Sequence, residues 1–171
     1  MPVHAFDAAE TMAGAGTLGL ELQQQAPELD TVLVAVGGGG LIAGIAAWYG
    51  RRVKVVGVEP EGSRALHASL EAGGPVDVTV ESVAADSLGA RNTGQLVYDI
   101  ARVNVDHVAL VADDAIIQAQ RLLWDRLRIA AEPGGAAALA ALISGRYVPR
   151  ANERVGVLLC GANVDAAKLG T

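Results

Sequence analysis

The feature that most constrains the fold of this chain is a run of four glycines directly after an apolar segment. Residues 32–36 read Val-Leu-Val-Ala-Val, a β-branched run typical of a strand buried on both faces. The glycines at 37–40 come next, and apolar residues at helical spacing then continue to Trp48. In such a strand–turn–helix, unpaired backbone N–H groups converge at the positive end of the helix dipole. The sequence therefore predicts an anion site, suited to a phosphate, at this glycine loop (residues 37–40).

Two other interpretations of the glycine loop have to be weighed. A flexible turn is one, but glycine loses more conformational freedom on folding than other residues, so four together favour a binding role. The other is a dinucleotide-binding loop. Gly38-x-Gly40-x-x-Ala43 matches the relaxed fingerprint, and Glu59 ends the next predicted strand, where a ribose-binding acid stands. Four consecutive glycines suit a wide loop around one phosphate group better.

Apolar strand segments alternate along the chain with segments of helical spacing. Strands are predicted at residues 31–36, 53–58, 108–111 and 155–159. Helices are predicted at about 8–25, 41–49, 63–72, 93–101, 113–127 and 136–143. This alternation predicts an α/β fold of three layers, with a mostly parallel open sheet and helices on both faces.

Local signals refine the predicted elements. Capping residue types precede four of the predicted helices: Asp7, Ser63, Thr93 and Asp113. Gly14 and Gly16 are expected to break or tighten the first helix. Apolar and polar residues alternate weakly over residues 76–82, which are predicted to be extended. Residues 86–90 show neither helical nor strand periodicity and are predicted to form a loop.

Composition limits the class of protein. The 171 residues suffice for one domain with a sizeable core, and hydrophobic residues make up 51% of them. A formal net charge of -6 without a basic run argues against a nucleic-acid partner. No apolar segment of membrane-spanning length is free of charge and glycine, so we expect no membrane partner. The single cysteine excludes an internal disulfide and suits a reducing, cytoplasmic setting.

Chemically useful side chains follow the predicted strands at the ends where parallel sheets bind ligands. Besides the glycine loop, these ends carry Glu59, Asp113 and Cys160, and Glu132 in a Pro-Gly-Gly turn is a candidate to join them. Cys160 has the alternative role of a small buried residue, and Glu132 that of a helix-terminal charge in water. The three histidines, at positions 4, 67 and 107, have no ligand spacing between them. A histidine-based metal or hydrolytic site is therefore not expected.

A family resemblance rests on several blocks of sequence. Gly37-Gly38-Gly39-Gly40-Leu41 after a valine-rich strand resembles the tetraglycine loop of pyridoxal-phosphate enzymes of the tryptophan-synthase-β fold type. Further blocks resemble this family in the same order: Phe6-Asp7, Gly14-Ala15-Gly16-Thr17, Val58-Glu59-Pro60, Ala85-Asp86, Glu132-Pro133-Gly134-Gly135-Ala136 and Leu159-Cys160-Gly161-Ala162-Asn163-Val164-Asp165. These blocks span nearly the whole chain, which more narrowly resembles serine/threonine dehydratases and serine racemase.

The resemblance implies pyridoxal 5'-phosphate as cofactor and a role for each matching residue. The glycine loop, with the N–H group of Leu41, would hold the cofactor phosphate. Cys160 would lie against the pyridine nitrogen, where a neutral thiol favours β-elimination over transamination. Glu132 matches a family glutamate near the ring and is a possible auxiliary to catalysis. Asp86 matches an aspartate at the mouth of the site, with Ser87 where a glycine is usual.

Some members of the family bind a divalent cation, and the resemblance implies Glu59 as its first ligand. Ser63 could offer a backbone carbonyl to the same cation. Ala65 stands where those members carry an acid, and this difference argues against a bound cation.

The family attaches its cofactor to a lysine in a Ser-x-Lys-x-Arg-Gly block, which this sequence does not contain. Lys54 opens a predicted strand and Lys168 is close to the C-terminus, and neither follows that pattern. The chain thus resembles the C-terminal portion of a dehydratase. We expect a single α/β domain over residues 1–171, without the segment and small domain that carry the Schiff-base lysine.

The resemblance implies that the full-length enzyme deaminates L-threonine or L-serine to a 2-oxo acid and ammonia. The alternatives are a nicotinamide-dinucleotide-binding oxidoreductase and a non-catalytic scaffold or regulatory half that binds a partner chain. For the 171-residue chain alone we expect no catalysis and weak binding of phosphate or sulfate at the glycine loop. We also expect homo-oligomers, formed through apolar surface that the absent segment would cover.

Overall fold

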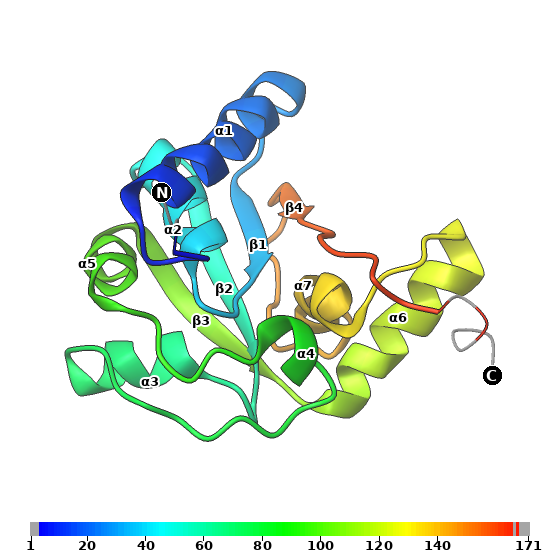
Figure 1. The fold of residues 1–171 in the computed structure, drawn as a ribbon. Helices are drawn as coiled ribbons and strands as arrows, with labels where there is room; N and C mark the ends of the chain where they lie inside the picture. Colours follow the sequence, from blue (N-terminus) through cyan, green and yellow to red (C-terminus); the bar gives the residue numbers. More distant parts are fainter. Residues whose placement is uncertain (1–3, 166, 168–171) are drawn as a thin grey trace.

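The computed structural model describes residues 4–165 and 167, and it confirms the predicted α/β architecture. A four-stranded sheet lies at its centre in the order β3-β2-β1-β4 (Figure 1). The strands are β1 (Thr31–Ala35), β2 (Lys54–Pro60), β3 (Val105–Val111) and β4 (Val155–Val157). Each neighbouring pair is parallel, and β1 pairs with both β2 and β4.

Helices cover both faces of this sheet, which confirms the three predicted layers (Figure 1). One face carries α2 (Gly40–Tyr49), α3 (Ala65–Ala72) and α5 (Gln95–Asn104), and α1 (Ala9–Gln25) packs against α2. The other face carries α6 (Asp113–Leu127) and α7 (Pro133–Ile143), with the short helix α4 (Ala85–Leu88) beside α7. Alternate residues of β1 serve the two cores: Val32 and Val34 face the first layer, and Leu33 and Ala35 face the second.

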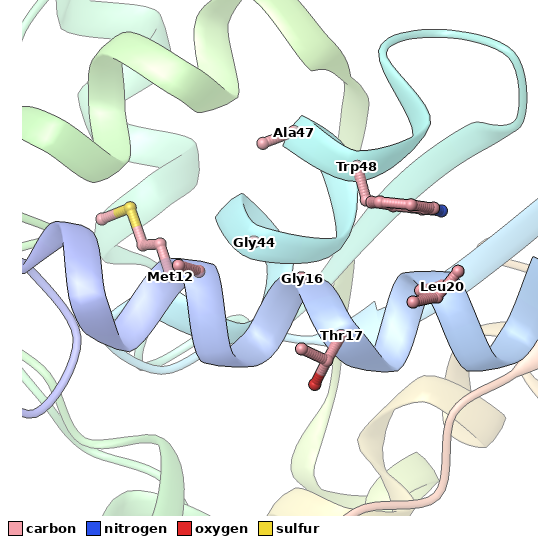
Figure 2. Close-up of a pocket in the computed structure, with 8 residues that line it drawn as sticks. Met12, Gly16, Thr17, Leu20, Gly44, Ala47 and Trp48 are labelled. Atoms are coloured by element: carbon pink, nitrogen blue, oxygen red, sulfur yellow. The ribbon is translucent and has the colours of Figure 1, made fainter.

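Helix α1 approaches α2 closely because both carry glycine where they meet (Figure 2). A Cβ atom on Gly44 would lie 2.8 Å from the backbone nitrogen of Gly16 and 2.7 Å from Cβ of Ala15. The sequence predicts that Gly14 and Gly16 break or tighten the first helix, and the predicted break is absent because α1 runs continuously through both. The missing side chain that serves helix packing is that of Gly44, because a Cβ atom on Gly16 would lie 3.4 Å from the carbonyl oxygen of Gly44, an ordinary contact distance.

The same two helices border an apolar groove of about 330 Å³ (Figure 2). Met12, Thr17 and Leu20 of α1 line it together with Ala47 and Trp48 of α2. None of its lining residues is charged, and none is a predicted site residue. This groove is therefore separate from the strand ends where the chemistry is expected.

Two predicted helix caps have other partners in the structure. Asp7 does not cap α1; its carboxylate accepts hydrogen bonds from the backbone N–H groups of Leu96 (3.0 Å) and Val97 (3.1 Å). These groups lie in the first turn of α5. Thr93, the predicted cap of α5, donates its hydroxyl to the carbonyl oxygen of Gly94 at 3.3 Å. The start of α5 thus takes its acceptor from a residue 89 positions away in sequence.

The first turn of α3 is capped by Glu59 at the end of β2, and not by the predicted Ser63. The Glu59 carboxylate accepts hydrogen bonds from the N–H groups of Leu66 (2.9 Å) and His67 (2.8 Å). Ser63 instead donates its hydroxyl to the carbonyl oxygen of Leu88 at 2.7 Å, which ties it to α4. Glu59 is fully buried, and burial raises its pKa to about 7, although the two hydrogen bonds act in the opposite direction.

This raised pKa predicts a pH dependence of stability. Between the ordinary glutamate value of about 4.3 and about 7, folded Glu59 retains a proton that the unfolded chain has released. The free energy of unfolding should therefore fall by up to about 3 kcal/mol as the pH rises through this range. Urea unfolding of the protein and of Glu59→Gln at several pH values measures the effect. Equal pH slopes in the two proteins would contradict it, because the amide in the variant cannot titrate.

Candidate cofactor site

The strand order creates a crevice at the carboxyl ends of β1 and β4. Helix α2, which follows β1, covers one face of the sheet, whereas α7, which precedes β4, covers the other. The connections of the two neighbouring strands β1 and β4 therefore lie on opposite faces of the sheet. Open parallel sheets bind ligands at such a switch point. A cavity of about 320 Å³ lies there. Five segments line it: residues 5–6, Ala35 with the glycine loop and Leu41, Ser87 and Leu88 of α4, Glu132 and Gly134, and Cys160 and Gly161.

The glycine loop brings backbone N–H groups to one side of this cavity. Helix α2 begins at Gly40, and its cap residue Gly39 has a φ of 89°, a left-handed conformation that favours glycine. The N–H groups of Gly40, Leu41 and Ile42 lie in the first turn, where no helical carbonyl is available to accept them. None of the residues that line the cavity is basic. An anion in the cavity would therefore be held by backbone N–H groups and the helix dipole.

Phe6 packs against the glycine loop, a contact that no local sequence pattern indicates. A Cβ atom on Gly38 would collide with the Phe6 ring, and one on Gly40 would lie 2.8 Å from Cα of Phe6. A Cβ atom on Gly39 would lie 2.5 Å from Cγ1 of Val97, which is buried. The glycines are therefore needed for packing on this side of the loop as well as for access to its backbone.

The backbone at the start of α7 is in direct contact with the backbone of the segment that follows β4. The N–H group of Glu132 donates a hydrogen bond to the carbonyl oxygen of Gly161 at 3.2 Å. A Cβ atom on Gly135 would collide with the carbonyl oxygen of Cys160, and one on Gly161 would collide with Oε1 of Glu132. The structure thus brings together Glu132 and Cys160, two residues that the sequence predicts for one site.

Cys160 and Glu132 are the two side chains with ionisable groups among those that line the cavity. Burial raises the pKa of the Cys160 thiol, and the negative charge of Glu132 raises it further. The partly buried thiol therefore remains protonated at neutral pH. It offers the cavity an uncharged group that can donate or accept a weak hydrogen bond.

Helix α4 presents Ser87 rather than Asp86 to the cavity. The sequence predicts a loop at residues 86–90, whereas residues 85–88 form one helical turn. Ser87 and Leu88 line the cavity, and Asp86 is exposed outside its lining. The turn is too short for a periodic pattern to reveal it. Residues 76–82, predicted to be extended, form no strand of the described sheet.

The remaining acidic and histidine candidates lie elsewhere. The carboxylate of Asp113 accepts hydrogen bonds from the hydroxyl of Ser82 (2.6 Å) and the N–H group of Val83 (3.0 Å). His67 and His107, distant in sequence, both line a surface cavity of about 350 Å³. Within the described ranges, no group of three or more His, Cys, Asp or Glu side chains is suited to hold a metal ion. Glu59 as a cation ligand stays a prediction, with both of its oxygens bonded to the start of α3.

Lys54 lies at the opposite end of the sheet, as the first residue of β2. Its ammonium group contacts Oε1 of Glu153 at 2.9 Å and the hydroxyl oxygen of Tyr147 at 3.1 Å. The same Glu153 oxygen accepts hydrogen bonds from Tyr147 and Thr31, each at 2.6 Å. These bonds hold the pKa of Glu153 well below its usual range, and they raise the pKa of Lys54. Lys168 lies outside the described residues.

Known proteins resemble this chain along nearly its whole length. Residues 1–161 match the family described as pyridoxal-phosphate dependent enzyme. Phenylserine dehydratase of Ralstonia pickettii is 48% identical over 96% of this chain and 52% of its own length. Biosynthetic L-threonine dehydratase of Salmonella typhimurium is 40% identical, over 95% of this chain and 32% of its own length. Serine racemase of Oryza sativa subsp. indica is 33% identical over 98% of this chain and 51% of its own length.

Solved structures show the same relationship. Threonine deaminase from T.th. is 36% identical with a TM-score of 0.87, over 95% of this chain and 60% of that one. Maize serine racemase is 35% identical with a TM-score of 0.88, and the match covers 98% of this chain and 54% of that one.

The chain belongs to the family of pyridoxal-phosphate-dependent enzymes, and pyridoxal phosphate is the cofactor of that family. Its relatives include threonine dehydratases and serine racemases, as the resemblance implied, and also a phenylserine dehydratase, which the resemblance did not name. This membership decides between the cofactors weighed from the sequence, in favour of pyridoxal phosphate over a nicotinamide dinucleotide. The chain spans about half the length, or less, of these curated relatives. No helix in the described ranges is both long and apolar enough to cross a membrane.

Proposed function

We propose that these residues form the phosphate- and ring-binding part of an enzyme that deaminates 3-hydroxy amino acids, with L-threonine or L-serine as substrate. The observation that carries the proposal is the 320 Å³ cavity that joins the glycine loop to Cys160 at the switch point of the sheet. The products are a 2-oxo acid and ammonia. The substrate loses its 3-hydroxyl group and α-hydrogen as water, and a water molecule then replaces the amino group.

The names of the relatives support a dehydration reaction. Phenylserine dehydratase and threonine dehydratase are named for amino acids that carry a hydroxyl group on the β-carbon. Serine racemases are similar at 33% identity, so racemisation of serine is the second candidate. The production of 2-oxo acid and ammonia from L-threonine, L-serine and phenylserine, measured beside D-serine formation, distinguishes these activities.

The residues of the cavity have distinct roles in this proposal. Pyridoxal phosphate, when bound, supplies an electron-withdrawing system conjugated to the substrate α-carbon. The backbone N–H groups of the glycine loop and Leu41 bind and orient the phosphate group. Cys160 gives the pyridine nitrogen an uncharged partner, because burial and Glu132 raise the pKa of its thiol. Such a partner does not keep the nitrogen protonated, which favours elimination over transamination.

A substitution series at Cys160 tests its proposed role in the complete enzyme. Cys160→Ser should retain most of the activity, because a hydroxyl preserves an uncharged hydrogen-bonding group. Cys160→Asp should change the absorption spectrum of the bound cofactor and the balance of reaction products, because a carboxylate stabilises a protonated nitrogen. An unchanged spectrum and unchanged products in Cys160→Asp would show that the thiol does not contact the ring.

The lysine that holds the cofactor is proposed to lie in a part of the enzyme beyond these 171 residues. Lys54 supports this, because its ammonium group is bonded to Glu153 and Tyr147 at the far end of the sheet. Borohydride reduction of the isolated 171-residue chain with pyridoxal phosphate, followed by peptide mapping, is expected to give no stoichiometric adduct. A stoichiometric adduct on Lys54 or Lys168, together with turnover of threonine or serine, would contradict the proposal.

A further inference from the structure

The start of α7 takes its side-chain acceptor from another helix rather than from its own cap residue. Glu132 is the cap residue, yet its carboxylate makes no capping hydrogen bond. A cap side chain with an acceptor oxygen can accept a hydrogen bond from the N–H group of the second or third residue of its helix. Here the N–H group of Gly134, the second residue of the helix, donates a hydrogen bond to the hydroxyl oxygen of Ser87 at 3.2 Å. Ser87 comes from α4, 47 residues earlier in the chain.

The backbone of α4 is tied to the fold beside this hydroxyl, although Ser87 itself is exposed. The carbonyl oxygen of Leu88 accepts a 2.7 Å hydrogen bond from the buried hydroxyl of Ser63. A Cβ atom on Gly134 would lie 2.5 Å from the Ser87 hydroxyl oxygen, so the two segments meet only because residue 134 is glycine. Ser87 Oγ also lies 3.4 Å from the carbonyl oxygen of Ala84, to which it donates.

The Glu132 carboxylate points instead toward the segment that follows β4. Its Oε1 atom occupies the space where a Cβ atom of Gly161 would stand. Gly161 has a φ of 81°, a conformation that further favours glycine at this position. The carboxylate thereby reaches the neighbourhood of the Cys160 thiol, and its charge raises the pKa of that thiol.

From these contacts we infer that Ser87 is a positioning residue: by capping α7 in place of Glu132, it keeps the Glu132 carboxylate beside Cys160 in the cavity. Without the hydroxyl, the N–H group of Gly134 loses its acceptor, and the negatively charged carboxylate of the cap residue Glu132 has the acceptor oxygens that can replace it at this helix start. The carboxylate would then turn back onto its own helix and away from Cys160. The meaning of this arrangement for catalysis rests on the proposed function, but the arrangement itself does not.

The thiol of Cys160 reports where the Glu132 carboxylate lies, and it is the only thiol in the sequence. Alkylation by iodoacetamide as a function of pH, without cofactor, gives a midpoint set by the thiol pKa and a plateau rate set by its accessibility. Glu132→Gln should lower the midpoint, because it removes the charge. At a fixed pH below the midpoint, alkylation should then be about three- to tenfold faster.

Ser87→Ala should lower the midpoint as Glu132→Gln does, and the double variant should show no larger change than either alone. Ser87→Thr, which keeps the hydroxyl, should alkylate with the midpoint of the unmodified protein. The inference is overturned if Ser87→Ala changes only the plateau rate, or if its effect multiplies with that of Glu132→Gln. Because no cofactor is present, failure of the proposed activity would leave this result intact, and the reverse also holds.

Discussion

Replacement of Glu153 by alanine is expected to lower the free energy of unfolding by about 3 to 5 kcal/mol. The Glu153 side chain is 7% exposed, and its Oε1 atom accepts hydrogen bonds from Thr31, Tyr147 and Lys54. Its other oxygen accepts a 2.7 Å hydrogen bond from the N–H group of Arg150. The substitution leaves these donors without their acceptor, and it leaves the Lys54 ammonium, only 25% exposed, without its counter-charge.

Urea unfolding measures this loss, and a second ion pair in the same protein provides the control. Glu61 contacts Arg146 at 2.8 Å, but the two side chains are 49% and 55% exposed. Glu61→Ala should therefore cost no more than about 1 kcal/mol. Equal costs for the two substitutions would show that burial of Glu153 adds nothing to its interactions.

The low pKa of Glu153 also predicts the pH at which its contribution disappears. The folded protein keeps Glu153 ionised at pH values where the unfolded chain, with a pKa of about 4.3, takes up a proton. Its stabilising effect is therefore complete above that value and is lost as the pH falls below it. The difference in stability between the protein and Glu153→Ala should shrink accordingly in acid.

Interactions close in sequence could be predicted, because their geometry follows from a few adjacent residues. The strand at residues 31–36, the glycine loop and helix α2 form one continuous unit, and the buried strand with its left-handed Gly39 confirms that prediction. The ends of the predicted strands also indicate that Cys160, with Glu132 as a candidate, shares one edge of the sheet with the glycine loop, and the parallel sheet does bring their segments to the same cavity. Specific roles for these two residues come only from the family resemblance.

Interactions between distant segments could not be predicted, because each local signal has more than one way to be satisfied. Asp7 carries the signal of a cap for the helix that follows it, yet it binds the start of α5. Glu59 shows the position of a ribose-binding or cation-binding acid, yet its oxygens bind the start of α3. In both cases a helix start needed an acceptor, and the tertiary fold brought a carboxylate to it.

The second large effect is expected at Gly39. In Gly39→Ala, the side chain must adopt a φ near 89° and would approach Cγ1 of the buried Val97 to 2.5 Å. The left-handed conformation alone costs about 1 to 2 kcal/mol, and the contact adds to it. The loop should therefore move, and its N–H groups should bind the cofactor phosphate at least about tenfold more weakly, because binding depends on their alignment.

A matched control uses a glycine to alanine change where the structure leaves room. Gly14 in α1 has no atom within 4 Å of the position of a Cβ atom. Gly14→Ala should leave phosphate binding unchanged and should stabilise the protein by up to about 1 kcal/mol, because alanine favours the helix. Weaker binding in both variants would show that the loss at Gly39 is not specific to the loop.

NMR titration tests directly whether the glycine loop binds the cofactor phosphate through its backbone N–H groups. On addition of pyridoxal phosphate, the N–H resonances of residues 37–41 are expected to shift most. Pyridoxal, which lacks the phosphate, should leave them in place, and Gly39→Ala should abolish the shifts while Gly14→Ala retains them. Shifts confined to other residues, or equal shifts with pyridoxal and pyridoxal phosphate, would contradict such binding.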